Sequence, residues 1–102
     1  QPKVLLMDEP FRGVDLITKF DLQQELMNVL DQQKTTVVLV SHSIDEAVFL
    51  SDTIYVLADS PLTIEKQFVV DVPRPREQGD SRLGKITTEI VKYLTMRSET
   101  LK

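Results

Sequence analysis

Three side chains that could act on a phosphate follow two short apolar runs. Asp8 and Glu9 come directly after residues 4–7, and His42 comes shortly after residues 37–40. A carboxylate can hold Mg²⁺ directly or through water, and a second carboxylate can orient or deprotonate an attacking water. A histidine can donate a hydrogen bond to a phosphoryl oxygen. A metal ligand, a base and a hydrogen-bond donor around one phosphate are the recurring groups of nucleotide hydrolysis.

Backbone segments must bring these side chains together. Residues 3–7 and 35–40 are expected to form strands buried on both faces, because their apolar residues are consecutive and the runs are short. A helix is expected over residues 16–33, so the two strands should be parallel neighbours in an α/β layer. The carboxyl ends of parallel strands lie at one edge of a sheet, where ligands bind. The side chains that follow the two strands, with Ser41 and His42 after the second, should therefore gather at that edge.

Shorter elements are expected after the second strand. Ser43 and Glu46 form a capping-box pattern that predicts a short helix over Ile44–Leu50. Strands are expected over Ile54–Leu57 and Thr63–Val70, and the Asp-Ser-Pro turn signal between them predicts a hairpin.

The last part of the chain predicts an extended segment and a helix. Residues 73–76, Pro-Arg-Pro-Arg, can continue neither a sheet nor a helix and must be extended. A final helix is expected over residues 81–97. Apolar residues share one face of each long helix at helical spacing. They are Leu22, Leu26, Val29 and Leu30 in the first helix, and Leu83, Ile86, Ile90, Val91 and Leu94 in the last.

Composition excludes several classes of protein. The chain has 102 residues, 41% of them apolar, which suffices for a core and fits one domain or part of one. It has no cysteine, so disulfides and zinc–thiolate sites are excluded. The net charge is −4, and residues 1–60, where acids outnumber bases, make a poor nucleic-acid surface. Residues 61–102 are more basic, which fits either an anionic partner or a solvated helix face. The apolar runs are too short to cross a bilayer. The start, Gln-Pro-Lys without methionine, leads us to expect a piece of a longer chain.

The combination of these segments resembles a known family. Val4–Pro10, VLLMDEP, is similar to the Walker B segment of ATP-binding cassette (ABC) ATPases, and Phe11–Asp15 stands where their D-loop lies. Val40–Ser43 resembles their H-loop, and Ile44–Ala47 continues the match. The resemblance implies a partial P-loop NTPase sheet of the RecA-like ABC type. Walker B and H-loop strands would be followed by a C-terminal hairpin and helix.

The resemblance implies a role for each site residue. Asp8 would be the magnesium-side acid, acting mostly through water, and would also contribute to nucleotide binding. Glu9 would polarise the attacking water, and His42 would contact the γ-phosphate. Asp15 would lie at the interface with a second ATPase domain, although from its position it could equally cap the following helix. The cofactors would be ATP and Mg²⁺, in the full-length domain only.

One short stretch indicates a subgroup of this family, and one residue differs from the pattern of that subgroup. Val70–Pro75, VDVPRP, is similar to a segment of the importer ATPases of the nitrate, sulfonate and taurine group. Arg12 stands where that group has a small residue, which puts close D-loop packing in doubt.

Several parts of an ABC ATPase are missing from these 102 residues. No G-x-x-x-x-G-K-[ST] phosphate loop exists among its three glycines, and the Q-loop and signature motif are also absent. We therefore interpret residues 1–102 as the C-terminal part of one ATPase domain, with a catalytic segment over 1–59 and a hairpin, linker and helix over 60–102. The chain alone should bind ATP poorly. Its sheet would lack the phosphate-loop strand, and open strand edges favour self-association.

The implied parent is a subunit that hydrolyses ATP for import of an anion. It would be cytoplasmic, on the inner face of the cell membrane, with a second ATPase domain and transmembrane permease subunits as partners and no nucleic acid. Two alternatives remain open from the sequence. One is a stand-alone, non-hydrolytic regulatory module derived from such an ATPase. The other is a receiver-like α/β domain with an acidic magnesium pocket, against which the Ser-His pair and the Val-Pro-Arg-Pro segment argue.

Overall fold

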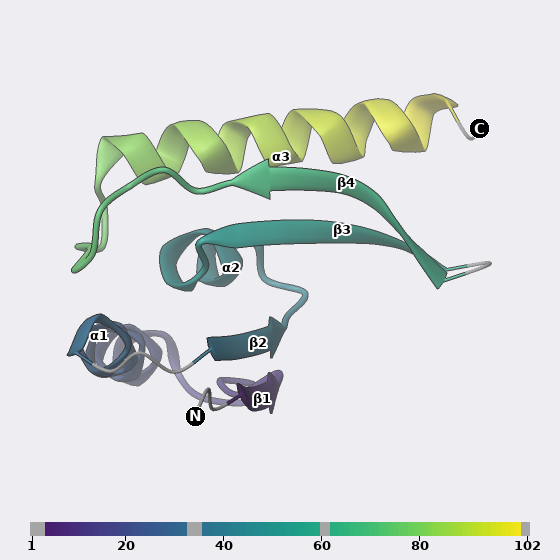
Figure 1. Cartoon of the computed structure of the whole chain (residues 1–102). Helices are drawn as coiled ribbons and strands as arrows, with labels where there is room; N and C mark the ends of the chain where they lie inside the picture. The colour runs from purple at the N-terminus through teal and green to yellow at the C-terminus, as the bar shows by residue number, and fades with distance from the viewer. Residues whose placement is uncertain (1–3, 33–35, 60–61, 101–102) are drawn as a thin grey trace.

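The computed structural model describes residues 4–32, 36–59 and 62–100. The predicted elements follow one another in the predicted order (Figure 1). The first hairpin strand and the last helix run longer than expected, and the second hairpin strand begins and ends one residue earlier. The predicted boundaries at Lys3, Gln33 and Thr35 lie outside the described residues. The elements are β1 (Val4–Asp8), α1 (Leu16–Gln32), β2 (Thr36–Val40), α2 (Ile44–Leu50), β3 (Thr53–Asp59), β4 (Leu62–Val69) and α3 (Ser81–Thr100).

The strands form two separate sheets within the described residues. β1 and β2 are parallel neighbours, with Asp8 opposite Val40, which confirms that the two strand ends lie at one edge. β3 and β4 form the predicted antiparallel hairpin, with an irregularity between Val56 and Leu57. β2 and β3 do not pair (Figure 1). The chain is therefore α/β, but its strands do not make one continuous sheet.

The prediction that the first two strands are buried on both faces is wrong. Leu6 lies opposite Val38 on one face of the β1–β2 sheet, and 68% and 48% of their surfaces are exposed. Leu5, on the other face, is also 48% exposed, although Leu39 packs against the core. Strands are buried on both faces only where other layers cover both. The described part of the chain does not supply those two layers.

The hydrophobic core surrounds α2 rather than a sheet. Val48, Phe49 and Leu50 at the end of α2 are at most 4% exposed, and Met27 from α1 is fully buried beside them. α2 can be buried almost all round because it lies between α1, the hairpin and α3 (Figure 1). The other core residues are Phe11, Val70, Val72, Leu83 and Ile90.

The buried side of α1 differs from the predicted one. Gln23 and Met27 are its buried residues, while Leu22 is 39% and Val29 is 47% exposed. Only Leu26, of the predicted apolar face, packs against the core, with Leu30 half-buried. The spacing locates a helix but not its rotation, which is set here by the contacts of Met27 with the end of α2 and its neighbours.

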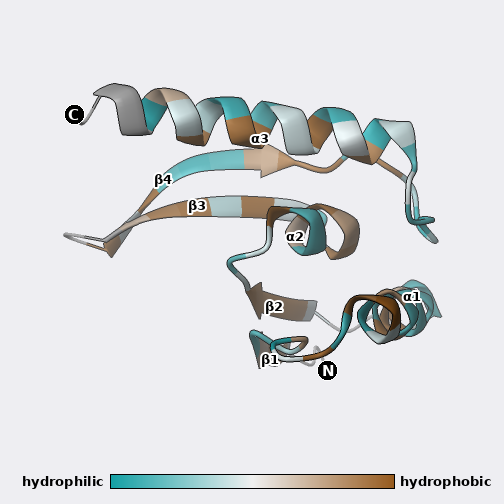
Figure 2. Cartoon of the chain, turned by 180° about the vertical axis from the view of Figure 1, so that it is seen from behind, coloured by the Kyte–Doolittle hydropathy of each residue, from teal (hydrophilic) through white to brown (hydrophobic). Residues whose placement is uncertain are grey.

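α3 lies along the β3–β4 hairpin. Its underside is hydrophobic and faces β4, as Figure 2 shows. The rings of Phe68 and Tyr93 meet edge to face, with 5.9 Å between their centroids. Leu83 and Ile90 are buried as predicted, but Val91 is 45% exposed at the margin of this face. The apolar face of this helix therefore covers the hairpin.

The molecule exposes more surface than a compact domain of its size. Its radius of gyration is 14.3 Å, against about 13 Å for 100 residues in a compact fold. Its accessible surface is 7568 Å², whereas a folded monomer of this mass exposes roughly 5,900 Å². No helix in the described ranges is both long and apolar enough to span a bilayer.

Candidate functional site

The site begins where β1 ends. Glu9 has φ of 50°, in the left-handed region that residues other than glycine seldom adopt. Its N–H donates to the carbonyl of Val40 over 2.8 Å, and its own carbonyl accepts from the N–H of Arg12. These two hydrogen bonds fix the backbone of Glu9 between the strand and the turn that follows. Strained backbone of this kind concentrates at functional sites.

Glu9 contacts the end of the neighbouring strand. Its Oε1 accepts a hydrogen bond of 2.9 Å from the backbone N–H of His42 and lies 3.6 Å from His42 Nε2. The Glu9 side chain is 20% exposed, and the His42 side chain is 89% exposed. The carboxylate is therefore held in place on one side, while the imidazole is free to meet a ligand from solvent.

A tight turn connects His42 to α2. The Ser43 N–H donates to Ser41 Oγ over 3.0 Å, and Ser43 Oγ accepts from the N–H of Glu46 over 3.3 Å. Ser43 is the N-cap of α2, as predicted. The reciprocal bond of a capping box, from the Ser43 N–H to the Glu46 side chain, is replaced by the bond to Ser41. The turn thus fixes the backbone of His42 by local bonds on one side and by Glu9 on the other.

Glu46 points inward rather than toward its own cap. The residue is 5% exposed, and its Oε1 has no hydrogen-bond partner. Burial raises the pKa of the Glu46 carboxyl above its ordinary value. The hydrogen bond with the Ser41 side chain and the positive charge of Lys19 oppose this rise, whereas the negative charge of Glu9 adds to it. A buried carboxyl group with a raised pKa therefore lies next to the turn that carries His42, a feature that the capping pattern does not predict.

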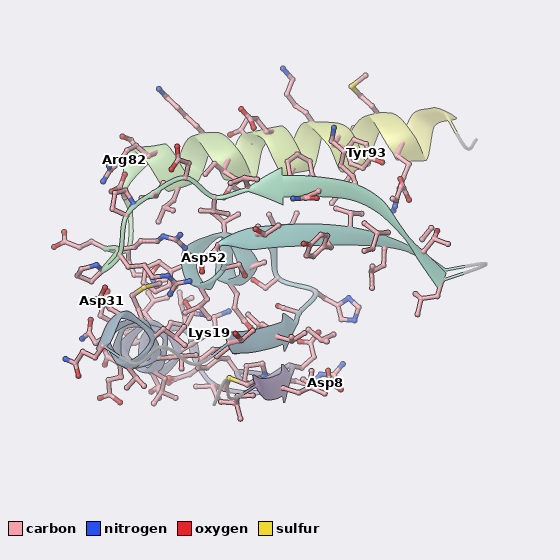
Figure 3. The ribbon with its side chains drawn as sticks, viewed as in Figure 1. Asp8, Lys19, Asp31, Asp52, Arg82 and Tyr93 are labelled. Carbon is pink, nitrogen blue, oxygen red and sulfur yellow. The ribbon has the colours of Figure 1, made fainter. Side chains whose placement is uncertain are left out.

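Asp8 and Asp15 are not drawn into this contact. Asp8 is exposed at the open end of β1, as Figure 3 shows. Asp15 caps α1, since its carboxylate accepts from the N–H and the hydroxyl of Thr18. In the described ranges no three His, Cys, Asp or Glu side chains cluster closely enough to hold a metal ion. One carboxylate with several waters is nevertheless a usual Mg²⁺ environment, so Asp8 fits that ion.

Two arginines make most of the side-chain hydrogen bonds near the core, although no role was predicted for them. Arg76 is 2% exposed, and Arg74 is half-buried next to it. Together they donate to the carbonyls of residues 48 to 51 at the end of α2, and both contact Asp52. Figure 3 shows Asp52 beside the junction of α2 and β3. Residues 73–76 form neither helix nor strand, as predicted, but the chain bends at Arg74 and Pro75 instead of running extended. No local pattern predicts that both arginines reach the end of α2.

Comparisons with known proteins agree with the resemblance. The chain is 38% identical over 102 residues to the nitrate import ATP-binding protein NrtD of Synechococcus elongatus, covering 95% of this chain and 37% of that protein. It is 41% identical over 100 residues to the bicarbonate transport ATP-binding protein CmpC of Synechocystis, covering 97% of this chain and 14% of that protein. The chain belongs to the ABC transporter ATP-binding family.

A third relative supports the same group. The aliphatic sulfonates import ATP-binding protein SsuB 2 of Burkholderia lata is 37% identical over 91 residues, covering 89% of this chain and 33% of that protein. No family model matches the chain. The chain thus spans about a third of the length of NrtD and SsuB 2 and a smaller part of CmpC. The predicted nitrate and sulfonate group is confirmed by these relatives.

Proposed function

We propose that this chain supplies the catalytic glutamate and the H-loop histidine of a subunit that hydrolyses ATP for import of a small anion. The contact between Glu9 and His42, from the ends of two parallel strands, carries the proposal. Nitrate, bicarbonate and sulfonates are named for the relatives, and an anion of this kind is the proposed cargo. The proposed partners are a second ATPase domain and permease subunits, at the inner face of the cell membrane.

Each site residue has a proposed task in this reaction. Glu9 accepts a proton from, or orients, the attacking water, because its carboxylate is fixed at one oxygen by His42. The exposed His42 imidazole contacts the terminal phosphate. Asp8 holds Mg²⁺ mostly through water, and Asp15 faces the second ATPase domain while it caps α1. Bound Mg²⁺ would neutralise charge on the transferred phosphoryl group.

The missing parts of the site are proposed to come from the rest of a longer domain. Residues 1–102 would be its C-terminal part, with 1–59 carrying the catalytic groups and 60–102 the hairpin, linker and helix. β2 and β3 do not pair with each other, which supports a phosphate-loop strand between them, and the exposed apolar residues of both sheets support the same proposal. The chain alone would then lack the groups that cradle phosphates.

The proposal is tested by grafting the chain into a relative. The aligned segment of NrtD is replaced by this chain, and ATP hydrolysis by the purified graft is measured with Mg²⁺. We expect hydrolysis by the graft and a fall in kcat of about 100-fold or more for Glu9→Gln, since that is the usual contribution of a general base. Glu25→Gln, on the exposed side of α1, is the matched control and should leave kcat unchanged. A Glu9→Gln graft as active as the control would refute the proposed role.

The isolated chain provides a second test. Titration calorimetry with ATP and Mg²⁺ should detect no binding in the micromolar range, because these 102 residues contain no phosphate loop. Magnesium-dependent binding at micromolar concentration would show that the phosphate-binding groups lie within these residues after all.

A further inference from the structure

The carbonyl groups at the end of α2 have an unusual set of partners. The last carbonyls of a helix have no partner within the helix. Here Arg76 donates to the carbonyl oxygens of Val48, Phe49 and Ser51, at 3.4, 3.0 and 2.7 Å, and Arg74 donates to that of Leu50 at 2.6 Å. Four consecutive carbonyls are thus bound by two cations at the negative end of the helix dipole.

The arginines are held in turn by the rest of the core. Arg76 also donates to the carbonyls of Val70 and Val72, in the segment that follows β4. Its side chain is 1% exposed, so these bonds replace the water that a guanidinium would otherwise bind. Arg74 reaches the sulfur of Met27 on α1 at 3.4 Å. The two side chains, which we call the arginine clamp, therefore fix the end of α2 to α1 and to the segment after β4.

The other end of α2 carries the proposed site. α2 has seven residues, and Ser43, its cap, follows His42 directly. A helix of two turns has little stability of its own and depends on tertiary contacts. The backbone of His42 is therefore positioned through a short rigid element whose far end is held by the clamp.

We propose that Arg76 is a positioning residue for the His42–Glu9 pair. It touches neither residue and acts through α2, by keeping the helix seated so that the His42 N–H meets Glu9 Oε1. This inference rests on the proposed function for its catalytic consequence, but the geometric effect is independent of nucleotide. Arg74 contributes to the same clamp with one carbonyl and is expected to matter less.

The geometric effect is measured in the chain itself by amide hydrogen exchange. Arg76→Met should make the His42 amide exchange about tenfold faster while amides of the β3–β4 hairpin keep their rates, because the carbonyls that Arg76 binds lie at the end of α2 and after β4, outside the hairpin. Arg76→Lys, which keeps a cation with fewer donors, should restore part of the protection. Arg82→Met is the control, since Arg82 pairs with Asp80 at the surface and should leave His42 unaffected. Equal acceleration of all amides, or none at His42, would overturn the proposal.

A milder variant covers the case in which Arg76→Met does not fold. Asp52→Asn removes the carboxylate that both clamp arginines contact and leaves the backbone carbonyls in place. It should accelerate exchange at His42 by a smaller factor and leave the hairpin unchanged. An Asp52→Asn chain in which His42 keeps its protection, or in which all amides accelerate alike, would contradict the positioning role.

The catalytic consequence is measured in the NrtD graft. Arg76→Lys should lower kcat about tenfold with KM unchanged, because a misplaced group affects the chemical step more than binding. Arg82→Met should change neither. If the unaltered graft does not hydrolyse ATP, the proposed function fails while the exchange result still decides the geometric claim. If the graft is active and Arg76→Lys leaves kcat intact, the positioning role fails alone.

Discussion

The backbone N–H of His42 lies 2.9 Å from Oε1 of Glu9, although 33 positions separate the two residues in the chain. The parallel pairing of β1 with β2 makes this contact possible, because it places Asp8 opposite Val40 and so brings the two strand ends together. The left-handed backbone of Glu9 then turns its side chain toward the second strand. One contact thus joins the two segments that resemble the Walker B segment and the H-loop.

The left-handed backbone conformation at position 9 should be strained for every residue except glycine. A left-handed residue with a Cβ costs about 1 kcal/mol or more relative to glycine. We therefore expect Glu9→Gly to be more stable than Glu9→Ala by about 1 kcal/mol, measured as the difference in the free energy of unfolding by urea. Both variants should lose the protection of the His42 amide, because neither has an acceptor for it. Equal stability of the two variants would show that the backbone relaxes at this position.

The buried Glu46 should make the protein less stable as pH rises. The pKa of its carboxyl is raised in the folded state, so the folded state holds its proton more tightly than the unfolded state. The free energy of unfolding should fall as the pH rises through 4.5, the ordinary pKa of a glutamate, and should level off above the pKa that Glu46 has in the folded state. Glu46→Gln should remove this slope and raise the free energy of unfolding at pH 7 by about 1 kcal/mol. Urea unfolding from pH 4 to 8 measures the effect, with the exposed Glu25→Gln as control.

Asp80 should have the opposite pH dependence. Hydrogen bonds from the side chain and the backbone N–H of Arg82 lower the pKa of Asp80 from 3.8 to about 2. The ionised Asp80 carboxylate should therefore stabilise the fold fully above pH 3.8, and this stabilisation should disappear as the pH falls through about 2. Asp80→Ala should therefore be less stable than the unaltered chain at neutral pH and equally stable at pH below 2, in thermal unfolding followed by circular dichroism. Asp80→Asn, which keeps a capping side chain, should lie between them at neutral pH.

The open face of the hairpin should promote self-association. Leu57 and Ile64 face each other across β3 and β4, and Leu62 lies beside them, each at least 50% exposed. Analytical ultracentrifugation of the chain should detect dimers or larger species. Ile64→Lys should raise the dissociation constant about tenfold, since a charge in an apolar contact costs more than 1 kcal/mol. Leu16→Lys, at an equally exposed position on α1, is the control. A stable monomer at all concentrations would contradict the prediction.

The local pattern of the chain determined much of what the structure contains. Every element was predicted in order, including the hairpin, the cap at Ser43 and the parallel pair of strands that joins Glu9 to His42. These features follow from residue types at fixed spacings, and local backbone preferences act over such distances. Family membership could be recognised for the same reason, because its motifs are short and contiguous.

Tertiary structure alone decided which of these residues are buried. Leu22 and Val29 have the spacing of a core face, yet Gln23 and Met27 are buried, because the rotation of α1 depends on partners distant in the sequence. The clamp made by Arg74 and Arg76 depends on where the end of α2 comes to lie, which no local pattern specifies. The sequence alone thus determined the elements and the residues that could act on phosphate. Burial, and with it the carbonyl groups that the arginines bind, is a property of the packed chain.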